Sequence, residues 1–296
     1  TDGTSWREIT AYTSSTVVTI DATVAWTAAT IKVGGALLTI STAVAVSVSG
    51  NLLYIKGTTF TLSGNAISTG GTRQWIGYGT TRGDGVQAVF DASGMTAGQN
   101  TFSIGDHVTL RHIRVNSSKS VAFTASAQGN CVNCTASSSV SYGFSALQSA
   151  INCLATGCAG GFQTTKVCFS CVAESTTTLH GFDFTSTGTV MAAFFCIARS
   201  CGSSGTVHGF NIGEGGRVIN CMAYNSRNNG FNINSNMGYI ANGIAMSNGG
   251  YGFTSPGDIG RLGITNCVAY NNTSGASNGL LSYLGESVSS LSADPF

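Results

Sequence analysis

The sequence predicts an all-β fold: a single-stranded, right-handed parallel β-helix with about 22 residues per coil and an N-terminal β segment. Two observations lead to this prediction. Two different sequence anchors recur in phase along the chain, and the segments between the turns are short and alternate small apolar residues with polar ones. Such alternation is typical of strands, and a coil of this length has no room for a helix of about 12 residues. The pattern therefore excludes βαβ units and helical repeats.

The first anchor is Gly-Phe or a close variant, and it marks one position in each coil. Successive anchors lie 18 to 28 residues apart, with a mean of about 22. Because the coils of a β-helix stack at about 4.8 Å, roughly ten coils would form a rod about 50 Å long. The anchor residues are Phe123, Phe144, Phe162, Phe182, Phe210, Phe231, Phe253 and Leu280, the last within Gly279-Leu280.

The second anchor reads Asn-Cys-apolar-Ala, and it contains six of the ten cysteines. Equivalent positions on successive coils lie above one another, so we expect a column of buried thiols that pack as small hydrophobic groups. Gly243 takes this position in one coil. The predicted structural ladder consists of Cys134, Cys153, Cys171, Cys196, Cys221 and Cys267.

Two cysteine pairs have the spacing of redox or zinc sites, namely Cys131-x-x-Cys134 and Cys168-x-x-Cys171. No histidine pair follows at zinc spacing, and the second cysteine of each pair belongs to the ladder, so we expect no metal and no cofactor. An asparagine precedes the ladder position in most coils. Asparagine tolerates unusual backbone angles and can hydrogen-bond from coil to coil, so we predict a structural ladder of turns at Asn133, Asn152, Asn220, Asn242 and Asn266.

These motifs are similar to a known group. The phrases Asn266-Cys-Val-Ala-Tyr-Asn-Asn272 and Asn220-Cys-Met-Ala-Tyr-Asn225 resemble the right-handed β-helix repeats of the pectate-lyase-like superfamily, over about residues 108–280. The resemblance implies the fold but no single function, because the superfamily includes lyases, hydrolases, adhesins and bacteriophage tailspikes. The opening Thr4-Ser-Trp-Arg-Glu-Ile-Thr-Ala-Tyr12 is similar to phage virion proteins. Rods that resemble tailspikes are usually trimers.

The repeat divides the chain into four segments. Residues 1–50 lack both anchors and are rich in Thr, Val and Ala, so we expect a β segment that caps the rod or attaches it to another molecule. Residues 51–107 are the irregular first coils, and residues 108–280 form the regular β-helix. Residues 281–296 are expected to cover the last coil, because a bare solenoid end is an open sheet edge.

The composition excludes several classes of partner. Only 8% of the residues are charged, against about 25% in an average globular domain, and the formal net charge is +1. The chain therefore lacks the basic surface that binds nucleic acid or an anionic membrane. It has no run of about 18 apolar residues, so no membrane span is expected. A surface of apolar and hydroxyl groups suits burial against neighbouring subunits.

Candidate catalytic groups gather between residues 166 and 217, although the carboxylates are scattered. The resemblance to polysaccharide-cleaving enzymes implies clustered carboxylates, and this chain has no Asp-Asp pair. Its coil register predicts that His180 stacks on His208 and that Glu174 stacks on Arg199, each at about 5 Å. These patterns point away from catalysis. If the rod were an enzyme, its acid and base would come from Asp183, Glu214, His180 and His208.

A candidate ligand surface shares the column of the two histidines. That column is predicted to carry Tyr142, Asn229, Tyr251 and Asn278 as well. Aromatic and amide groups can bind sugars, so Tyr142, Tyr251 and Asn229 are the candidate ligand-binding residues. The alternative is that the stripe is simply one exposed edge of the rod.

The sequence favours a non-enzymatic structural subunit of a virion or extracellular surface assembly, such as a phage capsid decoration or tail protein that contacts host glycans. The expected partners are copies of the chain itself, as a homotrimer, and other subunits of the assembly. Two alternatives stay open. One is a polysaccharide lyase or glycoside hydrolase that acts on acidic polysaccharide, and the other is a glycan-binding adhesin.

Overall fold

The computed structural model describes residues 9–14, 17–20, 52–64, 66–69, 74–125, 128–185, 190–235, 237–255, 263–278 and 288–291. The chain divides into two compact units, Thr1–Val46 and Ser47–Phe296. In the first unit, β1 (Ile9–Ser14) pairs with β2 (Val17–Ile20) in antiparallel orientation. This pair agrees with the predicted N-terminal β segment.

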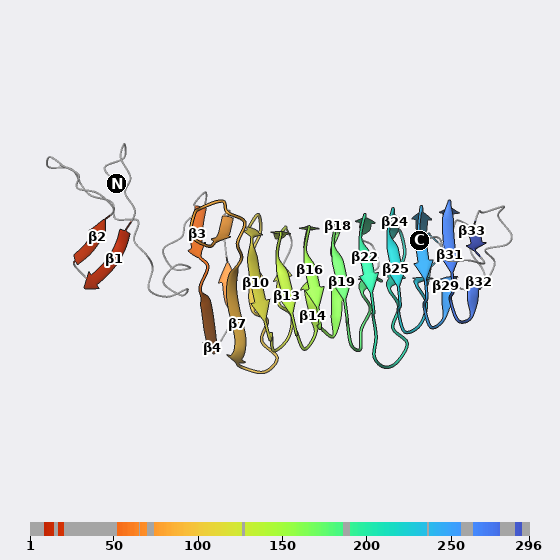
Figure 1. Cartoon of the computed structure of the whole chain (residues 1–296), viewed down its shortest axis with the longest axis horizontal. Coiled ribbons are helices and arrows are strands. Elements are labelled where there is room, and N and C mark those ends of the chain that lie inside the picture. Colours follow the sequence, from red (N-terminus) through yellow and green to blue (C-terminus); the bar gives the residue numbers. More distant parts are fainter. Residues whose placement is uncertain are drawn as a thin grey trace. The chain divides into compact units, whose positions relative to one another are not determined.

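The second unit is the predicted right-handed parallel β-helix (Figure 1). Each coil gives one strand to each of three sheets, which we number in chain order. The first sheet contains β3 (Leu52–Lys56), β6 (Gln74–Tyr78), β9 (Thr109–Arg111), β12 (Asn130–Val132), β15 (Ser149–Ile151), β18 (Val167–Phe169), β21 (Ala192–Phe194), β24 (Arg217–Ile219), β27 (Tyr239–Ala241) and β30 (Gly263–Thr265).

The other two sheets follow the same order. The second sheet contains β4 (Thr59–Gly64), β7 (Ala88–Met95), β10 (Ile113–Asn116), β13 (Thr135–Ser137), β16 (Leu154–Thr156), β19 (Val172–Glu174), β22 (Ile197–Arg199), β25 (Met222–Tyr224), β28 (Ile244–Met246), β31 (Cys267–Tyr270) and β33 (Val288–Leu291). The third sheet contains β5 (Ile67–Thr69), β8 (Phe102–Ile104), β11 (Phe123–Ala125), β14 (Tyr142–Ser145), β17 (Gly160–Gln163), β20 (Phe182–Phe184), β23 (Phe210–Ile212), β26 (Phe231–Ile233), β29 (Tyr251–Thr254) and β32 (Gly275–Asn278).

The two ends of the rod differ from its middle. Near the start, β7 has eight residues and its pairing with β4 shifts register between Thr61 and Ser63. Near the end, β33 adds to the second sheet beside β31. The predicted cap over residues 281–296 lies otherwise outside the described residues, and so does Leu280.

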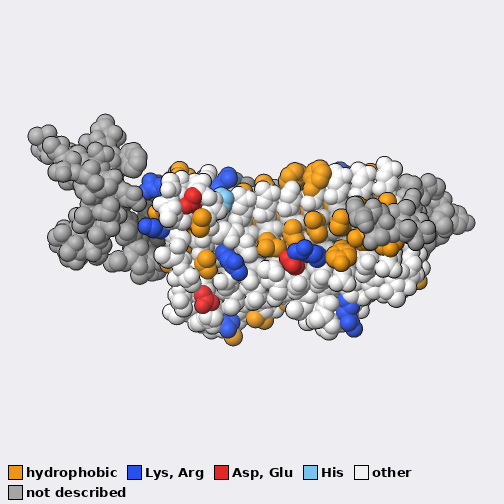
Figure 2. Space-filling model, viewed as in Figure 1, with side chains coloured by type: hydrophobic (Ala, Val, Ile, Leu, Met, Phe, Trp, Pro, Cys, Tyr) orange, Lys and Arg blue, Asp and Glu red, His pale blue; other side chains and the backbone are white. Residues whose placement is uncertain are grey.

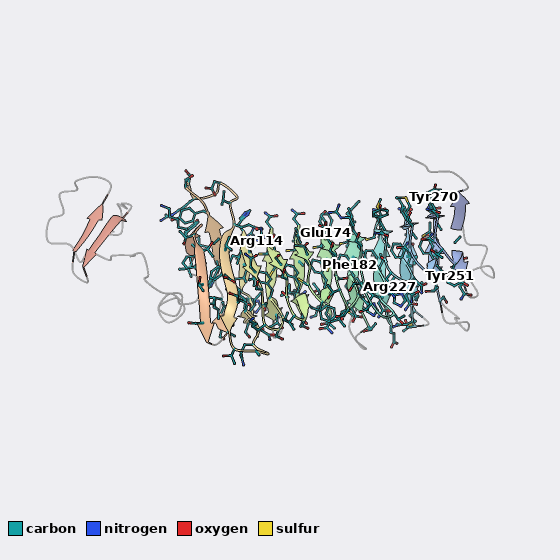
Figure 3. The ribbon with its side chains drawn as sticks, turned by 60° about the horizontal axis from the view of Figure 1, so that its bottom comes forward. Arg114, Glu174, Phe182, Arg227, Tyr251 and Tyr270 are labelled. Atoms are coloured by element: carbon teal, nitrogen blue, oxygen red, sulfur yellow. The ribbon has the colours of Figure 1, made fainter. Side chains whose placement is uncertain are left out.

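A column of stacked phenylalanines fills the rod beneath the third sheet. Eight rings, from Phe102 to Phe253, are fully buried, with neighbouring centroids 4.6–5.7 Å apart and ring planes within 9° of parallel. Figure 3 shows the side chains along the rod, with Phe182 of this column labelled. The predicted last anchor is wrong, because Ser277 and not Leu280 lies opposite Phe253. Ser277 is exposed in the last described coil of this sheet.

The glycine of the first anchor is required because it faces the alanine of the second. A Cβ atom added to any of six such glycines would lie 2.6–3.2 Å from the Cβ of that alanine. The second and third sheets therefore approach too closely here for any larger pair. This contact explains why two anchors far apart in the sequence keep phase. The glycines are Gly143, Gly161, Gly181, Gly209, Gly230 and Gly252.

The corner between the first and second sheets combines the cysteines and the asparagines. The six cysteines of the second anchor are buried, and each thiol donates to the backbone carbonyl two residues earlier at 3.3–3.5 Å. The residue before each thiol has a left-handed backbone, with φ between 51° and 55°. Asparagine adopts this conformation at little cost. Its amides also link coils, since Asn242 Nδ2 donates to Asn220 Oδ1 at 2.8 Å.

Two outward columns of apolar side chains flank this corner. The first-sheet column is Val132, Ile151, Phe169, Phe194, Ile219 and Ala241. The second-sheet column is Leu154, Val172, Ile197, Met222, Ile244 and Val268. We call the two columns, together with Phe195 at the corner, the apolar face. Figure 2 shows hydrophobic side chains gathered along the middle of the rod, with few charged groups among them.

The facing glycine and alanine columns make a prediction about stability. Gly209→Ala places a methyl group 2.9 Å from the Cβ of Ala223, so we expect a loss of about 1–3 kcal/mol from overpacking. Gly205→Ala is the comparison, because a Cβ there meets no atom within 4 Å and only its φ of 72° opposes the change, at about 1 kcal/mol. Urea unfolding measures both. Equal losses would contradict the proposed role of the Gly–Ala contact.

Candidate functional site

The outer face of the third sheet carries a polar side chain in every described coil. Each buried anchor residue is followed by a residue that points outward, because side chains alternate along a strand. Strand pairing aligns ten of these residues, and all bear a hydroxyl, an amide or a carboxylate. We call them the polar row: Ser68, Ser103, Thr124, Ser145, Gln163, Asp183, Asn211, Asn232, Thr254 and Asn278.

Hydrogen bonds join neighbours along the polar row. Thr254 Oγ1 donates to Asn232 Oδ1 at 2.8 Å, and Asn232 Nδ2 donates to Asn211 Oδ1 at 2.9 Å. Ser145 Oγ donates to Gln163 Oε1 at 3.1 Å. The side chains thus hold one another in fixed positions across several coils, and an amide or hydroxyl so held still has capacity for a further hydrogen bond.

Asp183 is the one ionisable residue in the polar row, and it is 8% exposed. Its Oδ2 accepts a hydrogen bond from Tyr142 Oη at 2.8 Å, and its Oδ1 accepts from Thr185 Oγ1 at 2.9 Å and from Asn211 Nδ2 at 3.3 Å. Tyr142 comes from two coils away. Its ring crosses the intervening coil at Gly160, where any Cβ would collide with it. Burial, and then the Asp183 charge, raise the pKa of the Tyr142 phenol.

The predicted histidine pair is confirmed. The rings of His180 and His208 stack with centroids 5.1 Å apart. The backbone N–H of His208 donates to His180 Nδ1 at 3.1 Å, and that of Asn229 donates to His208 Nδ1 at 3.3 Å. Both Nδ1 atoms are therefore acceptors and carry no proton. The next coil repeats the arrangement, since the N–H of Tyr251 donates to Asn229 Oδ1 at 2.9 Å.

Burial shifts the titration of both histidines. Burial, and secondly the neighbouring His180, lower the pKa of His208 to about 4. Burial also lowers the pKa of His180, against an opposing effect of Asp183. Both rings are therefore neutral in the folded protein near pH 7. A proton added at Nδ1 would remove an acceptor that a backbone N–H needs.

The structure brings some of the predicted site residues together and separates others. Tyr142 is hydrogen-bonded to Asp183, and the charge of Asp183 opposes the lowering of the His180 pKa. Glu214 is exposed in the turn after β23, and within the described residues it forms no ion pair or hydrogen bond with the other three catalytic candidates. The four catalytic candidates therefore do not form one constellation.

The candidate ligand-binding residues differ in accessibility. Tyr142 is 5% exposed and Asn229 is 8% exposed, so neither presents a free surface, whereas Tyr251 is half-buried. The pairing of Asn278 with Thr254 places it in the polar row and not, as predicted, in the histidine column. The predicted position is wrong because it was counted from Leu280.

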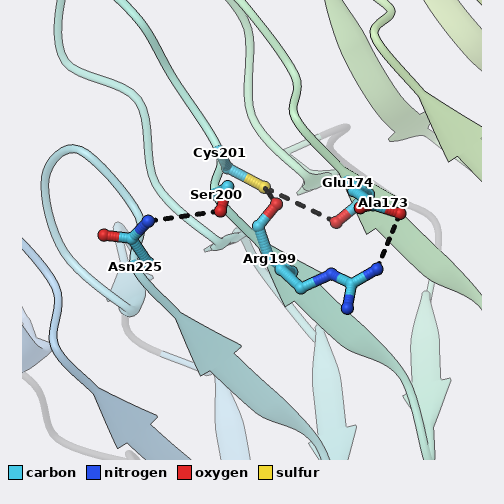
Figure 4. A network of polar contacts seen from close by, with 6 residues as sticks. All are labelled: Ala173, Glu174, Arg199, Ser200, Cys201 and Asn225. Atoms are coloured by element: carbon cyan, nitrogen blue, oxygen red, sulfur yellow. Dashed lines mark hydrogen bonds and ion pairs between the residues drawn. The ribbon is translucent and has the colours of Figure 1, made fainter.

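The predicted stacking of Glu174 and Arg199 is also confirmed, on the outer face of the second sheet. Paired strands place them side by side, and Arg199 Nη2 lies 2.8 Å from Glu174 Oε2 (Figure 4). In the same region, Asn225 Nδ2 donates to Ser200 Oγ at 3.2 Å and Cys201 Sγ donates to the carbonyl of Ala173 at 3.8 Å. This ion pair links two coils on the surface, where it contributes up to about 1 kcal/mol.

The cysteines are placed for packing. All ten are free and buried. Burial raises the pKa of the Cys158 thiol, and it raises the pKa of Cys201 to about 11, so these thiols stay protonated and unreactive. Among the described residues, no group of three or more His, Cys, Asp or Glu side chains is arranged to hold a metal ion.

The polar row was missed by the sequence reasoning, although its signal is local. In each regular coil, the residue directly after the anchor Phe is a threonine, serine, glutamine, asparagine or aspartate. The sequence reasoning used the residue two places before the Phe instead.

Among the described segments, none is a helix with the length and hydrophobicity of a membrane span.

Comparisons with known proteins establish the fold alone. No protein-family model and no curated protein matches the sequence. Among solved structures, ORF18 of Geobacillus virus E2 is similar with a TM-score of 0.55 and 13% identity, over 85% of this chain and 56% of that one. Pectate lyase Pel9A has a TM-score of 0.35 and 18% sequence identity, over 79% of this chain and 60% of that one. Tailspike protein 3 of bacteriophage CBA120 has a TM-score of 0.34 and 11% sequence identity, over 81% of this chain and 55% of that one. This chain thus spans less than two thirds of the length of each.

The histidine column predicts that acid destabilises the rod. The folded-state pKa of His208 is below its ordinary value of 6.5, so the unfolded chain binds more protons below that pH. The stability from neutral His208 is complete above about pH 6.5 and is lost as the pH falls towards 4. We expect the thermal midpoint to decrease over this range.

A matched pair of variants checks the cause of that decrease. Asparagine at position 208 keeps an acceptor for the next N–H, as Asn229 does, but does not titrate. The thermal midpoint of His208→Asn should therefore depend less on pH than that of the wild type. The thermal midpoint of His107→Asn, a change at an exposed histidine, should depend on pH as the wild type does. If His208→Asn lost as much of its thermal midpoint as the wild type between pH 6.5 and 4, the explanation would be contradicted.

Proposed function

We propose that this chain is a non-enzymatic structural subunit of a virion or extracellular surface assembly, such as a phage capsid decoration or tail protein. The observation that carries the proposal is that the side chains best suited to chemistry join coils to one another. Asp183 accepts hydrogen bonds from three side chains, and His180 and His208 each accept one from the backbone. A proton added at Nδ1 of either histidine would displace its backbone donor, and the three donors take up most of the acceptor capacity of the Asp183 carboxylate.

Two further points support an assembly subunit. The similar structure with a TM-score of 0.55 is a viral protein, which agrees with a virion location. The low charge of the chain and its apolar face also suit contacts with other subunits. The proposed partners are copies of the chain, as a homotrimer, and other proteins of the assembly.

A turnover assay tests the proposal against a polysaccharide lyase or glycoside hydrolase. We expect the full chain to release no product from polyuronates or neutral glycans above a heat-denatured control. Asp183→Asn and Glu214→Gln serve as matched variants, because each removes one carboxylate of a catalytic candidate. Product that the wild type forms and either variant fails to form would overturn the proposal.

The polar row favours a second function, contact with uncharged glycans. Nine of its ten side chains are neutral hydroxyls or amides, and both kinds of group can donate and accept hydrogen bonds to sugar hydroxyls. The side chains that donate hydrogen bonds to the Asp183 carboxylate in the described part of the chain are all uncharged, so Asp183 would repel an acidic polysaccharide. The row thus suits a neutral chain better than a polyuronate.

The glycan proposal predicts which variants weaken binding. Gln163 and Asn232 are the half-buried amides of the polar row, and Gln163→Ala or Asn232→Ala should weaken binding to a neutral glycan about tenfold, or about 1.4 kcal/mol. Thr156→Ala, on the second sheet, is the control. A glycan array followed by titration calorimetry measures the effect. Binding that both row variants leave unchanged would exclude the polar row as the contact surface.

A further inference from the structure

We propose that the apolar face is the surface through which copies of this chain pack side by side, with the first-sheet column of one copy against the second-sheet column of the next. The inference rests on the proposed function as an assembly subunit, and it names both the partner and the surface. Four observations support it: a strained aromatic residue, exposed apolar side chains, the extent of the face and its asymmetry.

The strained residue is Phe195. The corner position that it occupies has a left-handed backbone in every coil from His112 to Asn266, with φ of 51–55°. The other residues there are His, Asn or Ser, whereas Phe195 has a φ of 55° and a bulky side chain, a combination that is rare. Its side chain is 52% exposed, so packing within the rod does not explain the choice. A partner that buries the ring would explain it.

The neighbours of Phe195 extend the exposed apolar surface. Phe169 is 42% exposed and contacts Phe195 edge to face, with centroids 5.5 Å apart. Ile197, on the next strand, is 37% exposed. The Glu174–Arg199 ion pair lies at the far end of the same strands. An aromatic and aliphatic centre beside a paired, partly exposed charge is the usual anatomy of a protein–protein interface.

The extent of the face favours another copy of the same rod as its partner. Each apolar column runs over six coils, or about 29 Å, and the two strands with their corner are about 20 Å wide. The resulting area of about 580 Å² is of the order of the roughly 800 Å² that each partner buries in a standard interface. A straight stripe with one side chain per coil matches a surface with the same axial spacing, which a second copy possesses.

The asymmetry of the face, with one column on each of two sheets, suits a closed ring. Because the two columns lie on either side of one corner, each can meet a different neighbouring copy. When every copy meets one neighbour through its first-sheet column and another through its second-sheet column, the contact is heterologous, and a heterologous contact that closes by rotation forms a ring. Three copies, with their corners towards the axis, give the expected trimer.

The experiment measures the native mass by light scattering during size-exclusion chromatography at micromolar concentration. We expect a mass about three times the 30.2 kDa of one chain. Phe195→Asn introduces the residue that most other coils carry at this corner, so the variant should fold well. Its native mass should fall from that of a trimer to that of a single chain. Phe169→Thr keeps a strand-forming residue and should act in the same direction. Val140→Thr, at a 69% exposed valine outside the face, should keep the full mass.

The possible contrary results are distinct. A monomeric wild type, or a trimer that survives both Phe195→Asn and Phe169→Thr, would overturn the inference. A monomer that floats with phosphatidylcholine vesicles would assign the face to a membrane and would also overturn it. The proposed function is judged separately: a monomer without turnover overturns only the interface, whereas turnover that Asp183→Asn abolishes overturns the proposed function at any mass.

Discussion

In-register stacking of the coils is the constraint on which the rest of the structure depends. Most strands in the regular part have three or four residues, so no coil has a core of its own. Each coil becomes stable only when its Phe ring lies against the next ring and its glycine lies against the facing alanine. Stability in such a rod is approximately a sum of contacts between neighbours. The inner positions are consequently restricted to a few residue types.

The outer positions are free of that restriction, and the polar row and the apolar face carry different kinds of side chain. The third sheet presents hydroxyls and amides that are hydrogen-bonded to one another, whereas the corner of the first and second sheets presents apolar side chains. Both surfaces inherit the axial repeat of the core. A repeating surface suits a repeating partner, either a linear glycan or a second rod, and this links the two functions proposed for the chain.

The fold was predictable because its signals are local and recur. Gly-Phe and Asn-Cys-apolar-Ala each mark one coil, and counting from them placed His180 on His208 and Glu174 beside Arg199. Counting fails in the last described coil of the third sheet, where Ser277 and not an apolar anchor residue lies opposite Phe253. It also cannot show how far a side chain reaches. The bond from Tyr142 to Asp183 spans two coils over Gly160, and it depends on side-chain direction, which no spacing reveals.

The turns absorb differences in coil length without disturbing the stack. Phe144 and Phe162 are 18 residues apart in the sequence, and Phe182 and Phe210 are 28 apart, yet their ring centroids are separated by 4.8 and 4.6 Å. Distance along the rod is therefore counted in coils and not in residues. Side chains on successive coils are therefore held at a constant axial spacing of about 5 Å, and an insertion in one turn enlarges that turn without changing the spacing of the other coils.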